Sequence, residues 1–465
     1  LLFNTFREHK NTEVSYMPES ATEAPSRVRR SLLPILLLVF ATGLSFAFTC
    51  LPLPLAGGAL AGAGFMVLSV RRPVWGLVAL SAMLTLEGIA TGGSGISETR
   101  LVGAAAFGAW VIHMVLYGKS LRVNSTFSFA CIFLLWAGLS FLWAHDPLWA
   151  APYYLTLVQL VLLFLLTVNV IEDEKDFRLI LAALLLGAVV TGILSIKIFI
   201  TNPLERARTF EAQNANEYAA IVGLALIGGL YLAAVLKKRS MRILSALGAC
   251  CLVFPLILAQ SRTAWLATLA AVGVFLWHTE KRVRNFLAVA ASGAVVVIVL
   301  FAAGLISFTV VDRAAELIAM RSSKSSRLDV WRVASRVIYD HPLAGTGFMQ
   351  FPLVYNSYRS GTAGIRKDTE STRDAHSVYF GITADLGVIG LVLLCFIFWR
   401  AWSEEDLPGR AAPWIGKTLL VYLLVFSLGG SIYRDKFFWI ALALAVKARS
   451  IAAATVEQGR KQGEK

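Results

Sequence analysis

Three arginines lie beside apolar stretches of the chain, at positions where a bound anion could be recognised. They are Arg208, Arg262 and Arg327. A guanidinium group is planar and can bind two phosphate oxygens at once, so arginine suits a phosphate or diphosphate ligand well. We therefore predict that these three side chains bind an anionic ligand.

His376 has the position expected of an acid–base catalyst. It lies in the sequence Arg373-Asp-Ala-His-Ser-Val-Tyr379, directly after a basic segment and at the start of an apolar run. An imidazole at such an interface exchanges its proton near neutral pH, so it can accept a proton from a hydroxyl group. We predict that His376 is a general base. Asp374 and Asp385 are both candidates to orient its ring, and the sequence does not decide between them.

Sequence motifs for other chemistries are missing. The chain has no Gly-rich P-loop, no His-Glu-x-x-His and no Gly-x-Ser-x-Gly. It also has no outward Asp-x-Asp pair that could hold Mg²⁺ on a diphosphate. The five cysteines lie in or beside apolar runs without metal-ligand spacing, so we expect them to pack as small side chains. We expect neither a metal nor a cofactor, and arginines would then neutralise a diphosphate in place of a metal ion.

The elements that must position these residues are membrane-spanning helices. Of the 465 residues, 57% are hydrophobic and only 15% are charged, whereas a soluble protein carries about a quarter charged residues. The apolar residues form runs of about 20, the length needed to span a bilayer. We predict an all-α polytopic membrane protein with about 12–14 spans. The predicted spans are 31–49, 51–70, 73–91, 100–117, 126–144, 151–171, 177–200, 214–236, 241–259, 262–278, 285–308, 376–400, 414–430 and 434–448.

The basic loops indicate how these spans are oriented. With residues 27–30 in the cytoplasm, most short basic loops fall on the cytoplasmic side, as the positive-inside rule requires. This rule also explains the net charge of +14, so we do not expect nucleic acid as a partner. Arg208, Arg262 and Arg327 then lie on the outer side, where positive charge is normally scarce. Arg434 with Lys436 is a smaller exception of the same kind.

The same alternation predicts the domain organisation. We expect a cytoplasmic tail at 1–30, a first helix bundle at 31–308, an outer loop domain at 309–375, further spans at 376–448 and a cytoplasmic tail at 449–465. Within the loop domain, Ser326-Arg-Leu-Asp329 is typical of a helix start and Pro342 of a helix end. We predict that Leu328, Trp331, Ala334, Ser335 and Ile338 form the apolar face of this helix. On that helix we expect Arg327 to face the membrane bundle, and Arg332 and Arg336 to face solvent.

Four sequence blocks resemble the O-antigen ligase/polymerase superfamily. They occur in the family's order and at matching topological positions, between residues 201 and 391. The last block departs from the family pattern at Tyr379, Phe380 and Asp385, but not at its histidine. The blocks are Arg208-Thr-Phe with Asn214-Ala-Asn216; Gln260-Ser-Arg-Thr-Ala-Trp-Leu-Ala267; Ser326-Arg-Leu-Asp-Val-Trp331 followed by Asp340-His-Pro-Leu-Ala-Gly-Thr-Gly-Phe348; and Ala375-His-Ser-Val-Tyr-Phe-Gly-Ile-Thr-Ala-Asp-Leu-Gly-Val-Ile-Gly-Leu391.

The resemblance implies a multi-span, GT-C-like glycosyltransferase. A ligase of this family lies among the lipids of the bacterial inner (cytoplasmic) membrane, with its active site facing the periplasm. It takes a glycan from an undecaprenyl diphosphate donor, passes it to a sugar of the lipid A core, and requires no metal. Carried over to this chain, His376 would activate the acceptor hydroxyl, and Arg208, Arg262 and Arg327 would neutralise the departing diphosphate. The sequence does not indicate an oligomeric state.

Other functions remain open at this point. An O-antigen polymerase has the same donor but a second carrier-linked glycan as acceptor, and a related ligase glycosylates pilin or another protein. A lipid or polysaccharide transporter is disfavoured, because ion-coupled transporters place several ionisable groups within their spans and these spans have very few. A non-enzymatic assembly subunit would have no need of His376.

Overall fold

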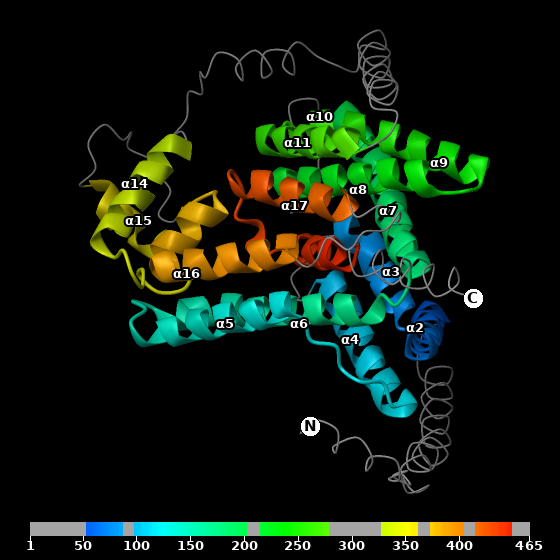
Figure 1. The fold of residues 1–465 in the computed structure, drawn as a ribbon, viewed down its shortest axis with the longest axis horizontal. Coiled ribbons are helices and arrows are strands. Elements are labelled where there is room, and N and C mark those ends of the chain that lie inside the picture. The colour runs from blue at the N-terminus through cyan, green and yellow to red at the C-terminus, as the bar shows by residue number, and fades with distance from the viewer. Residues whose placement is uncertain are drawn as a thin grey trace, which may run out of the picture. The chain divides into compact units, whose positions relative to one another are not determined.

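The computed structural model describes residues 53–86, 97–201, 214–278, 327–360, 373–403 and 414–448. Every regular element within these ranges is a helix. Seven of the described helical segments are long and apolar enough to cross a membrane, which confirms the predicted all-α polytopic membrane fold. The elements, numbered as in Figure 1, are α2 (Leu53–Arg71), α3 (Val74–Met83), η1 (Leu84–Leu86), α4 (Glu98–Tyr117), α5 (Ser125–Leu139), η2 (Ser140–Leu142), α6 (Pro147–Val170), α7 (Glu174–Thr201), α8 (Ala215–Val235), α9 (Arg239–Cys251), α10 (Val253–Leu258), α11 (Arg262–His278), α14 (Arg327–Asp340), α15 (Phe351–Ser360), α16 (Val378–Ser403), α17 (Trp414–Ser427), η3 (Ile432–Arg434) and a helix at 436–448.

The described helices follow the apolar runs of the sequence. Eleven predicted spans from 51–70 to 414–430 coincide with helices, except that 241–259 is divided into α9 and α10. The predicted spans 31–49 and 285–308 lie outside the described residues, as do the predicted tails 1–30 and 449–465. Several helices begin at a side chain that caps a free amide: Asp146 Oδ1, for example, accepts a hydrogen bond from Trp149 N at 3.0 Å, at the start of α6.

The chain forms two compact units. The first comprises residues 1–72 and 109–121, and its described part contains α2 and the end of α4. Within it, His113 Nδ1 lies 2.8 Å from Val70 O, so this histidine has a packed, hydrogen-bonded position. The second unit comprises residues 73–108 and 122–465 and contains all the described candidate site residues.

Close packing of helices, made possible by a glycine, stabilises the centre of the second unit. Helix α8 is almost entirely buried and packs against α7, α9, α11 and α17. Gly223 of α8 lies so close to Tyr422 and Thr268 that a Cβ there would meet both hydroxyls at 2.6 Å. Tyr422 Oη donates a hydrogen bond to Ala220 O at 2.6 Å. In a membrane, where burial of apolar surface favours no particular partner, such close packing and buried hydrogen bonds associate helices.

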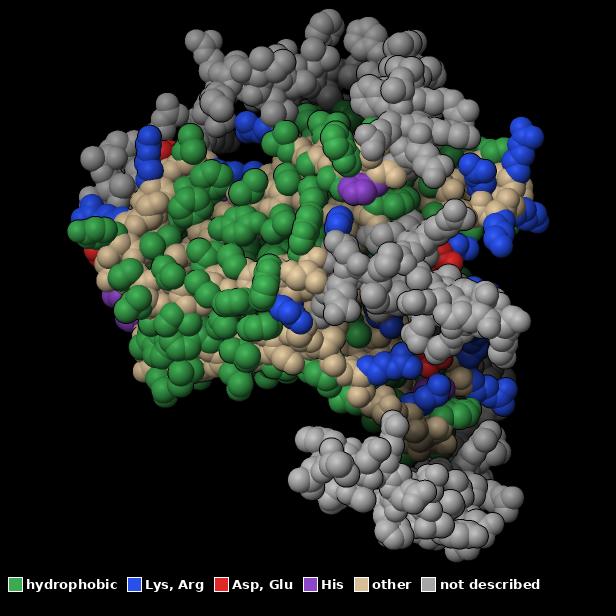
Figure 2. Space-filling model, in the orientation of Figure 1, with side chains coloured by type: hydrophobic (Ala, Val, Ile, Leu, Met, Phe, Trp, Pro, Cys, Tyr) green, Lys and Arg blue, Asp and Glu red, His purple; other side chains and the backbone are tan. Residues whose placement is uncertain are grey.

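The helices α5 and α16 lie side by side in the second unit and expose an apolar surface (Figure 1). Leu135 is 70% exposed and Phe396 39% exposed, although both are large and apolar. Figure 2 shows hydrophobic side chains covering much of the face over these helices, while Lys and Arg gather around the far end of α9. Lipid tails would cover an apolar surface of this kind.

A break interrupts α16 at Gly387, whose φ of 68° and ψ of −171° are not helical. The sequence predicted an unbroken span at 376–400, and the break arises because a loop at 341–350 docks there. Each backbone group freed inside a span must find a new partner, since a lost hydrogen bond costs several kcal/mol in lipid. The new partners are Thr346 N to Ala384 O (3.0 Å), Gly347 N to Asp385 O (2.8 Å), Val388 N to Pro342 O (2.8 Å) and Trp136 Nε1 to Leu386 O (3.0 Å).

Candidate functional site

Arg262 is the first residue of α11 and is exposed. The chain reaches it through a tight connection from α10, in which Gln260 adopts a left-handed backbone with φ 50°. Trp265 of α11 donates its indole Nε1–H to Leu256 O of α10 at 2.8 Å and thereby fixes this connection. The free amides of a helix N-terminus carry partial positive charge, which adds to the charge of the Arg262 guanidinium.

Arg327 lies against the start of α11. Its Nη1 donates a hydrogen bond to Thr263 Oγ1 at 2.6 Å. Burial lowers the pKa of Arg327, and the nearby charge of Arg262 lowers it further. Within the part of the chain that the structure describes, neither arginine forms an ion pair with a carboxylate. Two neighbouring cations that repel each other in this way favour the binding of an anion.

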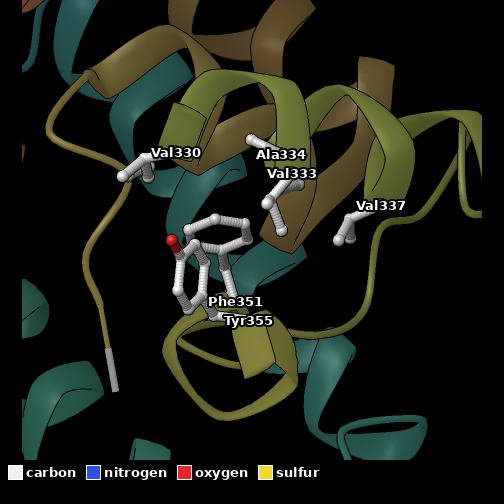
Figure 3. Close-up of a cluster of buried hydrophobic side chains, with 8 residues drawn as sticks. Val330, Val333, Ala334, Val337, Phe351 and Tyr355 are labelled. Carbon is white, nitrogen blue, oxygen red and sulfur yellow. The ribbon is translucent and has the colours of Figure 1, made fainter. Parts of the chain in front are cut away.

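The helix α14 holds Arg327 in this place by packing against α15 (Figure 3). Val330, Val333 and Val337 on α14 belong to one buried cluster with Phe351 and Tyr355 on α15, and Figure 3 shows the Val333 side chain directed toward the two rings. This cluster packs α14 against the rest of the second unit. Arg327 is the first residue of α14 and lies on the same side of the helix as Val330, three residues later.

The predicted apolar face of α14 was partly wrong. Leu328 is 58% exposed and Ser335 is exposed, whereas Val330, Val333 and Val337 are buried together with Ala334. The side of α14 that is buried depends on its packing against Phe351 and Tyr355 of α15, and the sequence of α14 alone does not contain this information. Arg332 and Arg336 are exposed, as predicted, and Arg332 forms a surface ion pair with Asp329 at 3.3 Å. The helix ends at Asp340, two residues before Pro342, also as predicted.

His376 lies in a connection that two neighbouring side chains fix in place. Its own backbone is left-handed, with φ 50°, a conformation that costs a non-glycine residue about 1–3 kcal/mol. Trp331 of α14 donates its Nε1–H to Ala375 O at 3.2 Å, and Ser377 Oγ donates to Ser427 O at 3.3 Å. Strained backbone that the surroundings enforce is common where a side chain must point in a functional direction.

The pKa of His376 is lowered from its usual 6.5, first because the surrounding protein removes part of the hydration of its ring. The Asp374 carboxylate raises the pKa in part. The cations Arg327, Arg373 and Arg434 lower it again. The imidazole is therefore neutral at pH 7, the state in which it can accept a proton. The bond from Trp331 to Ala375 O joins the helix that begins with Arg327 to the residue before His376.

The two candidate orienting carboxylates have other partners. Asp385 Oδ1 accepts a hydrogen bond from Phe351 N at 2.7 Å, so it caps the N-terminus of α15 beside the break in α16. Asp374 Oδ2 accepts a hydrogen bond from Arg434 Nη2 at 2.7 Å, and its Oδ1 accepts one from Ala375 N at 2.9 Å. Asp385 therefore has a structural role at α15, and Asp374 acts on the backbone next to His376.

The structure places three of the four predicted site residues in one region. Arg262, Arg327 and His376 each lie at or just before the start of a helix, and the three helices α11, α14 and α16 bring these starts together. Arg208 lies outside the described residues. Sequence reasoning did not identify Thr263 or Gly429, which lie against Arg327. Thr263 follows Arg262 directly in the motif, but nothing in the sequence around Gly429 indicates the contact.

Among the described residues, no three His, Cys, Asp or Glu side chains gather as metal ligands would. The described cysteines, Cys131, Cys250, Cys251 and Cys395, form no disulfide bonds with one another.

Comparison with known proteins bears on the region around this site. No curated protein matches the chain. Residues 247–395 match the family model described as O-antigen ligase, and this range runs from α9 to α16 and includes Arg262, Arg327 and His376. The resemblance that the motifs predicted is thus confirmed over this range.

Proposed function

We propose that this protein is an O-antigen ligase of the bacterial inner membrane. It transfers O-antigen polysaccharide from undecaprenyl diphosphate to a sugar of the lipid A core, at the periplasmic face, in lipopolysaccharide biosynthesis. The family match and the membrane helices support a lipid-linked glycan substrate and a membrane enzyme. The observation that carries the proposal is the grouping of Arg262 and Arg327, without carboxylate partners among the described residues, near a histidine that is neutral at pH 7.

The proposed reaction is an inverting displacement at the anomeric carbon. His376 takes the proton of the acceptor hydroxyl, and the hydroxyl oxygen attacks the anomeric carbon of the carrier-linked sugar. The bond to the diphosphate breaks, and undecaprenyl diphosphate leaves with the electron pair. Arg262 and Arg327, together with Arg208, neutralise the negative charge that accumulates on the leaving group. Cations placed in advance stabilise the transition state more than the ground state, because charge develops there during the reaction.

Substitution at the proposed base and at one proposed diphosphate ligand tests the reaction. We expect His376→Ala to lower the rate of transfer by about 10²–10⁴-fold, the contribution that a general base makes. Arg262→Ala should lower kcat/KM by a similar factor, because the leaving group loses a charge-assisted partner. The measurement is formation of glycosylated lipid A core by purified protein supplied with undecaprenyl diphosphate-linked glycan and lipid A core.

The control is Arg332→Ala, which removes an exposed arginine from α14 without touching this region. It should leave the rate unchanged. Full activity of His376→Ala would remove that residue from the mechanism. A product that forms only when a second carrier-linked glycan replaces the lipid A core would identify a polymerase instead. Transfer that a chelator stops and Mg²⁺ restores would contradict the metal-independent reaction.

A further inference from the structure

Arg434 is a cation at the proposed site whose position the diphosphate does not explain. It ends η3, in the connection between α17 and the helix at 436–448. Its Nη2 donates a hydrogen bond to Asp374 Oδ2 at 2.7 Å, and the pair is part-buried, with 23% and 35% of the two side chains exposed. Arg434 therefore differs from Arg262 and Arg327, because its charge is already neutralised by a carboxylate of the protein.

The guanidinium of Arg434 connects two strained parts of the backbone. Its Nη2 binds Asp374, two residues before His376, whose φ is 50°. Its Nη1 donates a hydrogen bond to Met349 Sδ at 3.2 Å, and Met349 also has a left-handed backbone, with φ 59°. Tyr433 Oη lies 3.8 Å from the same sulfur. One side chain thus fixes the histidine connection and the loop at 341–350 relative to each other.

Two contacts on other sides complete the support of the histidine. Trp331 binds Ala375 O from α14, and Ser377 binds Ser427 O at the end of α17. These two bonds hold residues 375 and 377, on either side of His376. The bond from Arg434 to Asp374 holds the segment just before them, where the chain enters from residues outside the described ranges.

We propose that Arg434 is a positioning residue, which through its ion pair with Asp374 holds the His376 imidazole in the direction needed to accept the proton of the acceptor hydroxyl. This inference rests on the proposed role of His376 as the base. A misplacement of about 1 Å in a reacting group can cost about 10² in rate. Loss of the ion pair should therefore lower kcat and change the KM for the donor little, because the diphosphate ligands remain.

The test compares Arg434→Gln, Asp374→Asn and the double variant in the transfer assay, across a range of pH. On the alkaline plateau, where His376 is neutral in every variant, each single substitution should lower kcat by about 10². The double variant should lose no more than either single variant, because both changes remove the same interaction. Arg434→Lys keeps the charge beside Asp374 and should recover most of the activity. Arg332→Gln is the matched control for the loss of one positive charge and should behave as the wild type.

The acid limb of the pH profile gives a second readout. Arg434 lowers the pKa of His376 and Asp374 raises it. The limb should therefore move to higher pH in Arg434→Gln and to lower pH in Asp374→Asn. A change that only loosens the fold has no reason to move the limb in opposite directions.

Three results would overturn the proposal. One is an unchanged plateau kcat in Arg434→Gln, a second is a raised donor KM at constant kcat, and a third is a multiplicative loss in the double variant. If Arg434→Gln does not fold, as judged by its melting temperature, Asp374→Asn tests the expected loss of kcat and Arg434→Lys the expected retention, and an unchanged plateau kcat in Asp374→Asn then overturns the proposal. Failure of the proposed function is distinct from these results, because it appears as an inactive wild type or an active His376→Ala variant.

Discussion

The arginines of the site are of two kinds when single residues are compared. Arg434 is paired with Asp374, whereas Arg327 donates to the neutral hydroxyl of Thr263 and has no carboxylate partner among the described residues. An arginine that is part-buried beside a second cation is costly for the fold unless a ligand supplies negative charge. The sequence predicted which arginines lie on the side of the membrane where positive charge is scarce. It did not predict which of them has a carboxylate partner, because Asp374 and Arg434 are 60 residues apart in the chain.

Gly429 tests the position of Arg327. A Cβ at this residue would lie 2.4 Å from Thr263 Oγ1 and 2.6 Å from Arg327 Nη1, so the guanidinium must move away. We expect Gly429→Ala to raise the KM for the carrier-linked donor about tenfold, which corresponds to roughly 1.4 kcal/mol for one lost charge-assisted hydrogen bond. Steady-state kinetics with varied donor measure this effect.

Gly273→Ala is the matched control, because Gly273 lies in α11 and a Cβ there meets nothing within 4 Å. It should leave the KM unchanged. An unaltered donor KM in Gly429→Ala would argue against a role of Arg327 in binding the diphosphate.

At the scale of helices, apolar runs and proline predicted most boundaries but not the break in α16. The predicted span 376–400 reads as one continuous helix, and its glycines alone do not place a break. The break depends on the loop at 341–350, which contacts residues 38 positions further along the chain. The buried face of α14 depends in the same way on the rings of α15. Both are decided by a partner element, which no pattern within a single helix contains.

Gly387 tests this break. Its φ is 68°, and a Cβ there would lie 2.0 Å from Leu343 O, an atom of the backbone that cannot move aside easily. We expect Gly387→Ala to destabilise the protein by about 2–5 kcal/mol, through backbone strain and the displaced loop. The melting temperature of the purified protein should fall accordingly.

Gly108→Ala serves for comparison, since a Cβ at Gly108 in α4 meets nothing within 4 Å. Its melting temperature should match that of the wild type. Equal melting temperatures for the two variants would show that the loop does not depend on the break.

In the second unit as a whole, the ends of α6 and α16 lie close to the connection that precedes α5. Arg400 Nη2 donates to Ser125 Oγ at 2.8 Å, and Arg122 N donates to Asn169 Oδ1 at 2.8 Å. These segments are ones that the alternation of basic loops assigns to the same side of the membrane. The positive-inside rule predicts that this side is the cytoplasm.

Labelling of introduced cysteines tests the orientation. In a variant without its native cysteines, Leu148→Cys at the site end should react with a membrane-impermeant thiol reagent added to intact spheroplasts. Lys238→Cys, in the connection between α8 and α9, should react only after the membrane is opened. Leu148 is 86% exposed and Lys238 is also exposed, so both thiols are accessible to water-borne reagent on their own side. The reverse pattern would place the arginine site in the cytoplasm and contradict the proposed function.

The docking of the loop at 341–350 into α16 limits how the site can open. Backbone hydrogen bonds and the Asp385–Phe351 contact join the loop and α15 to the middle of a transmembrane helix. The pair α14–α15 is therefore fixed to α16, and moving it away would break several buried hydrogen bonds at once. Because Arg327 begins α14 and His376 precedes α16, we expect these two side chains to keep a fixed separation while the proposed glycan substrate enters and leaves.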